Sequence, residues 1–304
     1  MQFVRPGGSR LSALEEEKTP ARRLAEAWRR HERSWKDHRF VYAVISRRSG
    51  GVSIGLNLSP DKACNFNCVY CQVDRASPRT PAEVDLDRLT AELKIILQAE
   101  KDGSLYIDAP FDALLPAERG LRDIAFSGDG EPTAYSRFEE VTRVAAEARR
   151  AFGSQSSKLV LITNAAYLDN PGISAALRIL DENNGEIWAK LDAGTEEYFR
   201  EVNRATIPLS RILENIQEAA RIRPLVIQSL WMRLYGKQPA ESELTAWLER
   251  LKGILAGGGR IKTVQLNTIV RKPAESRVAP LTRDEMERIA NFLKQEIPVQ
   301  VEIF

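Results

Sequence analysis

The chain has 304 residues, 43% of them hydrophobic, which is enough for one large α/β domain with a core of its own. Its 44 Lys and Arg against 42 Asp and Glu give a formal net charge of +2, which excludes a chain committed as a whole to nucleic acid or an anionic membrane. No stretch approaches the roughly 18 apolar residues of a membrane span, and MQFVRPGGSR lacks the apolar region of a signal peptide. We therefore expect a cytoplasmic protein with no membrane partner.

The segment 12–39 is rich in charge and predicts an N-terminal helical extension. Its apolar side chains recur at near-helical spacing after Pro20, at Leu24, Ala25, Trp28 and Trp35. Its Arg-Arg pairs could contact RNA, but a helix face that is simply exposed to solvent is the favoured interpretation. We divide the chain into this extension, residues 1–39, and one catalytic domain, residues 40–304.

Short apolar runs alternate with amphipathic stretches from about residue 40 onward. The apolar runs predict strands over residues 52–58, 123–127, 158–163, 187–191, 225–232 and 263–270. The amphipathic stretches predict helices over residues 82–100, 136–152, 172–182, 209–222, 241–256 and 283–295. About six β-then-α units with buried strands favour a parallel sheet, either doubly wound or curved into a barrel or part of one. The closing VQVEIF alternates like an additional strand.

All three cysteines lie within eight positions, in the motif CNFNCVYC of residues 64–71. The motif follows the first predicted strand, and loops at the carboxyl ends of such strands form the site in strand-then-helix folds. One loop can therefore present Cys64, Cys68 and Cys71 to a compact iron-sulfur centre. Because a 4Fe-4S cluster has four irons, three cysteines would leave one iron open to another ligand.

Two other interpretations of the cysteines stay open at this point. A structural zinc site would need a fourth ligand, and the only histidines, His31 and His38, lie upstream in the charged segment. Chance clustering of buried thiols is the second alternative.

A second motif, IAFSGDGEPT, again stands where a predicted strand gives way to a loop. Gly128 and Gly130 allow close approach of the backbone to a ligand, and Glu131 supplies a carboxylate that could hold an ammonium group. Alone, the motif is equally typical of a polar Asp-Gly turn. Beside an open cluster it is a candidate amino-acid binding loop.

Together these motifs resemble the radical S-adenosylmethionine (radical SAM) superfamily, with Tyr70 at the aromatic position of C-x-x-x-C-x-aromatic-C. More narrowly, the chain is similar to the iron-sulfur oxidoreductases related to wyosine-type enzymes over about residues 40–295. The blocks that carry this similarity are SRRSGGVSIGLNLSPDKACNFNCVYCQ, SGDGEPT, ITNAAYL, KLDA, REVNRAT and VQLNTIVRKPAES.

The resemblance implies a partial TIM-like (β/α) barrel of about six units, with a 4Fe-4S cluster on the three cysteines and S-adenosylmethionine on the open iron. A one-electron donor such as flavodoxin or ferredoxin would supply the electron that cleaves S-adenosylmethionine to a 5′-deoxyadenosyl radical. The radical would abstract hydrogen from a small-molecule or nucleoside substrate. By motif, Tyr70 would lie along the adenine, and Gly130 with Glu131 would hold the methionyl amino group.

Further candidates stand at the ends of later strands. Thr163 and Asn164 could bind a ribose or carboxylate, or could simply cap the next loop. Lys190 and Asp192 could face the site, although an ion pair at the rim is favoured.

Polar residues near the other predicted strands complete the set. Gln228, Asn267 and Arg271 would be costly to bury without partners, so they line a substrate pocket or satisfy one another. Arg47 and Arg48 are surface charges or contacts to a phosphate or carboxylate of the substrate.

The chain lacks the extra cysteines with which wyosine-forming enzymes bind a second cluster, so synthesis of a tricyclic base on tRNA is not expected. Two alternative functions remain at this stage. One is a glycyl-radical activating enzyme acting on a partner protein, and the other is an RNA-binding protein with a structural metal site.

Overall fold

The computed structural model describes residues 20–30, 33, 35–75, 82–273 and 275–304. Most of the expected N-terminal extension and His31 lie outside the described residues. Among the described residues, no helix is both long and apolar enough to cross a membrane.

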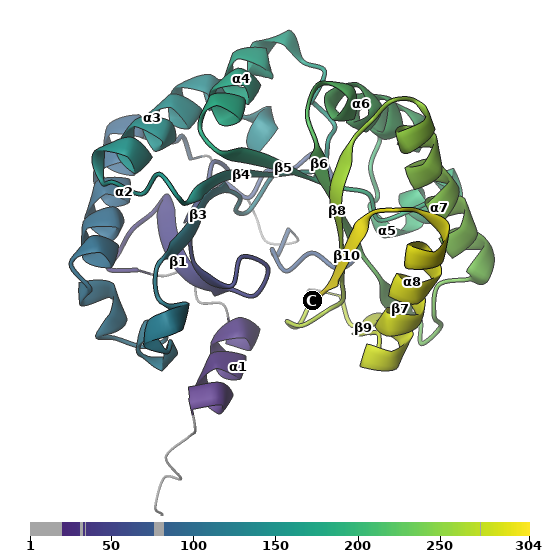
Figure 1. Ribbon diagram of the computed structural model, residues 1–304, viewed down its shortest axis with the longest axis horizontal. Helices are drawn as coiled ribbons and strands as arrows, with labels where there is room; N and C mark the ends of the chain where they lie inside the picture. Colours follow the sequence, from purple (N-terminus) through teal and green to yellow (C-terminus); the bar gives the residue numbers. More distant parts are fainter. Residues whose placement is uncertain (1–19, 31–32, 34, 76–81, 274) are drawn as a thin grey trace, which may run out of the picture.

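An eight-stranded sheet, curved into an open ring, forms the centre of the molecule (Figure 1). Its order is β1 (Val41–Ser46), β2 (Gly51–Leu56), β3 (Leu121–Phe126), β4 (Lys158–Thr163), β5 (Gly185–Lys190), β6 (Leu225–Leu230), β8 (Ile261–Asn267) and β10 (Gln300–Ile303). All neighbours from β2 to β10 are parallel, whereas β1 runs antiparallel to β2. Since β1 and β10 are the two edges, the barrel is partial.

Helices cover the outer face of the ring and leave its inner face to strands and loops (Figure 1). They are α2 (Leu86–Lys101), α3 (Phe138–Ala151), α4 (Ser174–Glu182), α6 (Leu209–Ile222), α7 (Glu241–Ala256) and α8 (Arg283–Glu296). A shorter α5 (Glu196–Val202) precedes α6, and β7 (Met232–Leu234) pairs with β9 (Val278–Pro280) in a small second sheet. The described elements therefore contain the six predicted β-then-α units.

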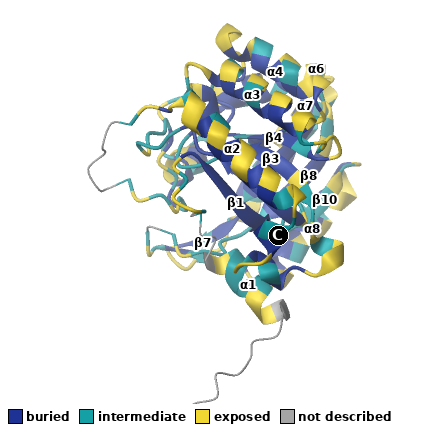
Figure 2. Cartoon of the chain, turned by 90° about the vertical axis from the view of Figure 1, so that its left-hand side faces the viewer, coloured by how far each residue is buried: buried dark blue, intermediate teal, exposed yellow. Residues whose placement is uncertain are grey.

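The parallel strands from β2 to β8 are mostly buried, which is why they are rich in apolar residues, whereas the edge strand β10 is half-buried to exposed. Figure 2 shows buried strands beneath helices whose outward faces are exposed. Local signals set the helix bounds: Asp85 caps α2 by accepting a hydrogen bond from the backbone of Arg88, and Thr282 with Glu285 forms a capping box on α8.

The predicted elements are confirmed with a few corrections. The helices predicted over 209–222 and 241–256 and the strand over 158–163 have the observed bounds. The strand predicted over 225–232 divides into β6 and β7, and neither β1 nor α5 was predicted. The prediction of a parallel sheet is confirmed for the strands from β2 to β10, and β1 is added antiparallel because a tight turn connects it to β2.

The described part of the N-terminal extension packs on the barrel. Helix α1 (Pro20–Arg30) contributes Leu24 and Trp28 to the border of the main core, while Trp35 lies beyond the end of the helix and also contacts the core. Buried Glu92 of α2 accepts hydrogen bonds from the backbone N–H groups of Arg39, Phe40 and Val41. These contacts join the extension to the first strand.

The turn between β1 and β2 extends into the space that the ring surrounds (Figure 1). It carries Arg48, whose guanidinium lies 5.3 Å from the centre of the Trp188 ring on β5. Trp188 belongs to a small cluster of buried residues with Ala125, Val160 and Val226. The turn therefore places a cation near the middle of the barrel.

Candidate functional site

The cysteine loop follows β2 and lies at the carboxyl ends of the strands. Cys64, Cys68 and Cys71 are free and partly buried, and all three line one cavity of about 300 Å³. Backbone hydrogen bonds tie the loop to the chain after α5: Val69 N–H donates to the Val202 carbonyl at 2.9 Å, and Asn67 N–H to the Asn203 carbonyl at 3.2 Å. One loop therefore brings all three cysteines to one cavity, and their role as cluster ligands stays a prediction.

Two hydrogen-bond donors approach the sulfurs. Asn203 Nδ2 lies 3.5 Å from Cys68 Sγ, and Arg75 Nη2 lies 3.6 Å from Cys71 Sγ. Burial raises the pKa of Cys64, and raises that of Cys68 to about 11, so both free thiols hold their protons at neutral pH. Metal binding would have to displace those protons, and the two donors would then stabilise thiolate charge.

The Glu131 carboxylate is buried and already accepts several hydrogen bonds. Its Oε1 accepts hydrogen bonds from the hydroxyls of Thr133 at 2.6 Å and Thr163 at 2.7 Å. Its Oε2 accepts a hydrogen bond from the backbone N–H of Asn164 at 2.7 Å. Burial raises the pKa of Glu131, although these hydrogen bonds oppose that shift. Glu131 therefore connects β3 to β4, and Oε2 retains capacity for one more donor.

Thr163 and Asn164 perform the capping role that the sequence left open. Thr163 Oγ1 accepts from Ala165 N–H, and Asn164 Oδ1 accepts from Ala166 N–H. Asn164 Nδ2 also donates to Asn65 Oδ1 in the cysteine loop at 2.8 Å. Both side chains still line the cavity beside the cysteines.

The two glycines of the second motif allow close approach of protein backbone. A Cβ on Gly130 would overlap the carbonyl of Ala63, immediately before Cys64, and the side chain of Ser59. A Cβ on Gly128 would overlap Asn57, whose side chain also bonds Asp129. The glycines thus set the position of the Glu131 loop against the cysteine loop, and both line the cavity.

Asp192 is the centre of a buried network behind Tyr70 and Lys190, two residues that line the cavity. Its Oδ2 accepts hydrogen bonds from the hydroxyl of Tyr70 and from Asn203 Nδ2, the latter at 2.9 Å, and lies 3.5 Å from Lys190 Nζ. Lys190 Nζ also lies 4.8 Å from the centre of the Tyr70 ring. Burial and the nearby Asp192 carboxylate raise the pKa of Tyr70 well above its usual value, which keeps the phenol protonated. The favoured Lys190–Asp192 ion pair is present, and Lys190 and Tyr70 also face the cavity.

The remaining polar candidates separate into two groups. Gln228 is buried and donates to Gln265 at 2.8 Å, and Asn267 donates to the backbone carbonyl of Gln265 at 3.1 Å. Gln228 and Asn267 therefore form hydrogen bonds with a neighbouring residue, and they do not line the cysteine cavity. Arg48 and Arg271 do line it.

Sequence reasoning missed several residues of this site. Asn203 and Arg75 contact the cysteine sulfurs, and Arg33 forms an ion pair with Asp129 at 2.6 Å on the cavity's edge. The only available signal was that Asn203 lies inside the block REVNRAT.

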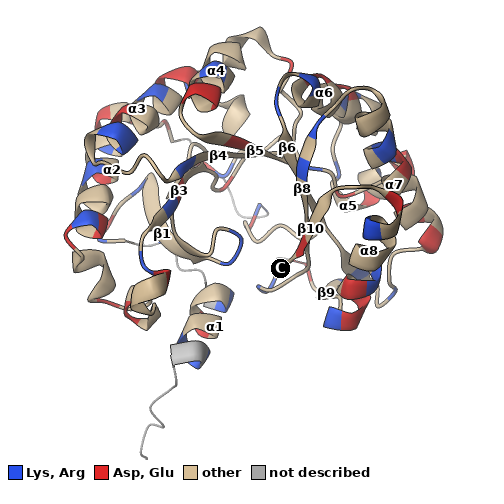
Figure 3. Ribbon diagram, in the orientation of Figure 1, with Lys and Arg blue, Asp and Glu red and all other residues tan. Residues whose placement is uncertain are grey.

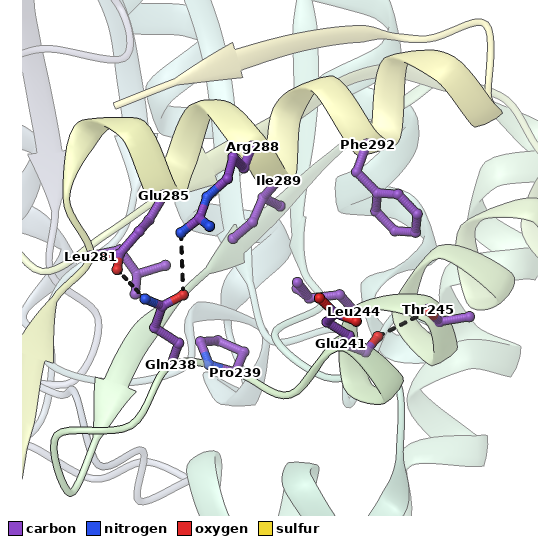
Figure 4. A pocket seen from close by; sticks show the side chains of 10 residues that line it. All are labelled: Gln238, Pro239, Glu241, Leu244, Thr245, Leu281, Glu285, Arg288, Ile289 and Phe292. Atoms are coloured by element: carbon purple, nitrogen blue, oxygen red, sulfur yellow. Dashed lines mark hydrogen bonds between the residues drawn. The ribbon is translucent and has the colours of Figure 1, made fainter.

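A separate hollow of about 390 Å³ lies between α7 and α8 (Figure 4). Its polar side chains bond one another: Gln238 donates to Glu285, and Arg288 approaches Gln238 at 3.5 Å. Glu285 also completes the capping box of α8. Glu285 and Gln238 are therefore occupied by structural hydrogen bonds.

The cysteine cavity fits an iron-sulfur cluster better than a single metal ion. Among the described residues, no group of three or more His, Cys, Asp or Glu side chains is placed to hold one ion, which counts against a structural zinc site. Three free thiols on one loop with N–H donors beside two of them match the ligand chemistry of a cluster. The buried Oδ1 of Asn203 and Nε of Arg75 also lack partners among the described residues.

The fold and the thiol-lined cavity define a partial parallel α/β barrel with its site at the carboxyl ends of the strands. The family model "Radical SAM superfamily" matches residues 58–232, which include the cysteine loop and the Glu131 loop. The chain belongs to the radical SAM superfamily, enzymes that use a 4Fe-4S cluster and S-adenosylmethionine. It is accordingly an iron-sulfur enzyme of that superfamily.

Relatives with this sequence pattern occur in distant organisms. A UPF0026 protein of Helicobacter pylori is 25% identical over 258 residues, which cover 84% of this chain and 73% of that protein. A UPF0026 protein of Methanocaldococcus jannaschii is 24% identical over 242 residues, covering 79% of this chain and 66% of that protein.

Solved structures with low sequence identity share the fold. A radical SAM methyltransferase of Sphaerobacter thermophilus has a TM-score of 0.57 at 12% identity and covers 86% of this chain and 69% of its own. Streptococcus suis SuiB bound to S-adenosylmethionine has a TM-score of 0.54 at 13% identity, covering 81% of this chain and 49% of its own. TYW1 with a lysine-pyruvate adduct bound has a TM-score of 0.51 at 15% identity, covering 90% of this chain and 80% of its own.

Proposed function

We propose that this chain reductively cleaves S-adenosylmethionine and uses the resulting radical to abstract hydrogen from a small-molecule or nucleoside substrate. The observation that carries the proposal is that Cys64, Cys68 and Cys71 face the same cavity as the Glu131 loop. A one-electron donor such as flavodoxin or ferredoxin would supply the reducing equivalent.

In this proposal the three cysteines hold a 4Fe-4S cluster that leaves one iron open to S-adenosylmethionine. Cys64, Cys68 and Cys71 would hold the cluster, which when bound would supply the one-electron reduction that cleaves a carbon–sulfur bond of S-adenosylmethionine to give a 5′-deoxyadenosyl radical. The chain's own residues would bind and orient S-adenosylmethionine and the substrate, and would exclude water from the cavity.

Each wall of the cavity has a separate task. Oε2 of Glu131 and the backbone of Gly130 would accept an ammonium group beside the cysteines, with Gly128, Thr163 and Asn164 supporting that part of the lining. Tyr70, whose hydroxyl donates to the buried Asp192, would stack its ring on an adenine. Lys190 would bind a carboxylate or ribose oxygen while it remains paired with Asp192.

The test is formation of 5′-deoxyadenosine from S-adenosylmethionine by the full chain, reconstituted with iron and sulfide without oxygen and reduced with dithionite. A variant with Cys64, Cys68 and Cys71 all changed to Ala is the control. We expect slow cleavage in the unaltered protein and none in the variant. Absence of cleavage from protein that carries a full iron-sulfur complement would contradict the proposal.

A further inference from the structure

Cations dominate the charged lining of the cysteine cavity. Its lining contains one carboxylate, Glu131. Its cations are Arg33, Arg48, Arg75, Lys190 and Arg271. Glu131 accepts its hydrogen bonds from Thr133, Thr163 and Asn164, and it forms no ion pair with any of the five cations in the described residues.

Three of the five cations have partners within the protein. Arg33 pairs with Asp129 at 2.6 Å, Lys190 pairs with Asp192 at 3.5 Å, and Arg75 donates to the Asp129 carbonyl at 2.8 Å. These three cations therefore have structural roles that explain their presence.

The other two, Arg48 and Arg271, form no hydrogen bond or ion pair in the described residues. Arg48 comes from the turn between β1 and β2, where the Trp188 ring supports its guanidinium at 5.3 Å and the buried Asp123 gives it longer-range attraction. Arg271 comes from the segment after β8. Elements far apart in the chain thus contribute two guanidinium groups to the lining of one cavity. Figure 3 shows the basic turn between β1 and β2 inside the ring.

The electrostatic environment of Arg271 is unfavourable in the absence of an anion. Burial, and then the charges of Arg33, Arg48 and Arg47, lower the pKa of Arg271 to about 10. The side chain is still charged at neutral pH, so its charge is held partly buried among like charges. An arrangement of this kind is stabilised when a ligand supplies the missing negative charge.

We propose that Arg48 and Arg271 form an anion subsite and that the substrate carries a phosphate group bound there. This inference rests on the proposed function, because it names the class of substrate that the same cavity admits. Planar guanidinium groups bind phosphate oxygens through paired hydrogen bonds, and two such groups match a dianion better than a single carboxylate.

A second cavity extends the basic surface outward from Arg271. It shares Arg33, Gln72, Val73 and Arg271 with the cysteine cavity. It adds Arg29, Lys62 and Lys272 to the lining, against Asp74 and Asp129. The phosphate can therefore belong to a small molecule, or to a nucleic-acid strand that continues along this surface.

The experiment measures binding of inorganic pyrophosphate to the full chain, with its cluster reconstituted, by titration calorimetry. The variants are Arg271→Gln and Arg48→Gln, and the matched control is Arg283→Gln, whose side chain is 85% exposed on α8. We expect saturable binding that weakens at least about tenfold in each cavity variant and is unchanged in the control. Equal affinity in all four proteins, or no binding to the unaltered chain, would overturn the proposal.

The design separates this subsite from the proposed reaction. Arg271 lies in a loop, so Arg271→Gln decides the question even if Arg48→Gln does not fold, as judged by thermal melting. Pyrophosphate that binds equally well with saturating S-adenosylmethionine supports a substrate subsite, whereas full competition would assign the arginines to S-adenosylmethionine and overturn the proposal. Pyrophosphate binding without formation of 5′-deoxyadenosine would contradict the proposed function alone.

A parallel titration distinguishes the two sources of phosphate. If the substrate is a nucleic acid, a short single-stranded RNA binds more tightly than pyrophosphate, and Lys272→Gln weakens only the RNA. If it is a small molecule, Lys272→Gln leaves both affinities unchanged. In both cases Arg271→Gln must weaken the binding of each ligand, and failure to do so would contradict the subsite.

Discussion

Nδ2 of Asn203 lies 3.5 Å from Sγ of Cys68, although the two residues are 135 positions apart. The same nitrogen donates to the buried carboxylate of Asp192 at 2.9 Å, which fixes the side chain. An N–H group directed at a ligating sulfur stabilises negative charge there and favours the reduced cluster. If Cys68 holds the proposed cluster, Asn203 acts on it as a positioning residue.

We expect Asn203→Ala to retain its iron and to have a more negative cluster potential. A net hydrogen bond of about 0.5–1.5 kcal/mol corresponds to about 20–60 mV for a one-electron couple. The measurement is a redox titration followed by electron paramagnetic resonance, with the exposed Gln98→Ala on α2 as control. An unchanged potential in a fully loaded Asn203→Ala protein would show that the contact does not act on the cluster.

Gly130 should not tolerate even one additional carbon. Because a Cβ would overlap the carbonyl of Ala63, Gly130→Ala should separate the Glu131 loop from the cysteine loop. We expect a loss of about 1–3 kcal/mol in unfolding free energy, together with weaker binding of S-adenosylmethionine.

Gly253 is the matched control for this substitution. It lies within α7, and no atom lies within 4 Å of the position that a Cβ would take there, so Gly253→Ala should raise stability by up to about 1 kcal/mol. Urea denaturation and calorimetric titration with S-adenosylmethionine test both variants. Similar behaviour of Gly130→Ala and Gly253→Ala would rule out the close approach of the two loops.

Glu131→Gln should separate the structural role of this side chain from its binding role. The amide has one acceptor oxygen where the carboxylate has two, so it loses the hydrogen bonds either of Thr133 and Thr163 or of Asn164; we expect a lower melting temperature as well as weaker S-adenosylmethionine binding. Thr133→Val removes one structural hydrogen bond but leaves the carboxylate. Thr133→Val should therefore lower the melting temperature and leave the affinity nearly unchanged; an equal loss of affinity in both variants would assign Glu131 a structural role only.

Glu92 makes stability depend on pH at the junction with the N-terminal extension. Burial raises the pKa of Glu92, but hydrogen bonds from the backbone of Arg39, the side chain of Arg88 and the backbone of Phe40 and Val41 outweigh it, and the pKa is lowered overall. Its stabilisation is thus present above the unfolded-state pKa of about 4.3 and is lost as pH falls through the lower folded-state value.

Replacing this carboxylate gives the corresponding test. Glu92→Gln should lower the unfolding free energy by about 1–3 kcal/mol at pH 7, and the difference from the unaltered protein should shrink at pH 3.5. Exposed Glu287→Gln serves as the control. A difference that stays constant between the two pH values would contradict a lowered pKa for Glu92.

Local signals explain why much of the fold could be predicted from sequence. The apolar run of β4 and the amphipathic stretches of α6 and α7 carry their own periodicity, so their bounds were predicted correctly. Strand β1 has a similar apolar run and was not predicted; its antiparallel direction could not be predicted because buried antiparallel and parallel strands have the same apolar pattern.

The site also contains residues that could be predicted from sequence and residues that could not. The three cysteines belong to one short loop, so their convergence on one cavity was visible in their spacing. Two partners of Glu131, Thr163 and Asn164, lie at the end of β4, and Asn203 lies 135 positions from Cys68; only the folded chain brings these residues together.

The most direct test of the central claim is electron paramagnetic resonance of the dithionite-reduced protein before and after addition of S-adenosylmethionine, with iron and sulfide determined on the same sample. We predict about four irons and four sulfides per chain, as the cluster's composition requires, and a spectrum that changes when S-adenosylmethionine binds the open iron. Stoichiometric zinc in place of iron, or a 4Fe-4S spectrum that S-adenosylmethionine leaves unchanged, would contradict the assignment of Cys64, Cys68 and Cys71 as the ligands of an open cluster.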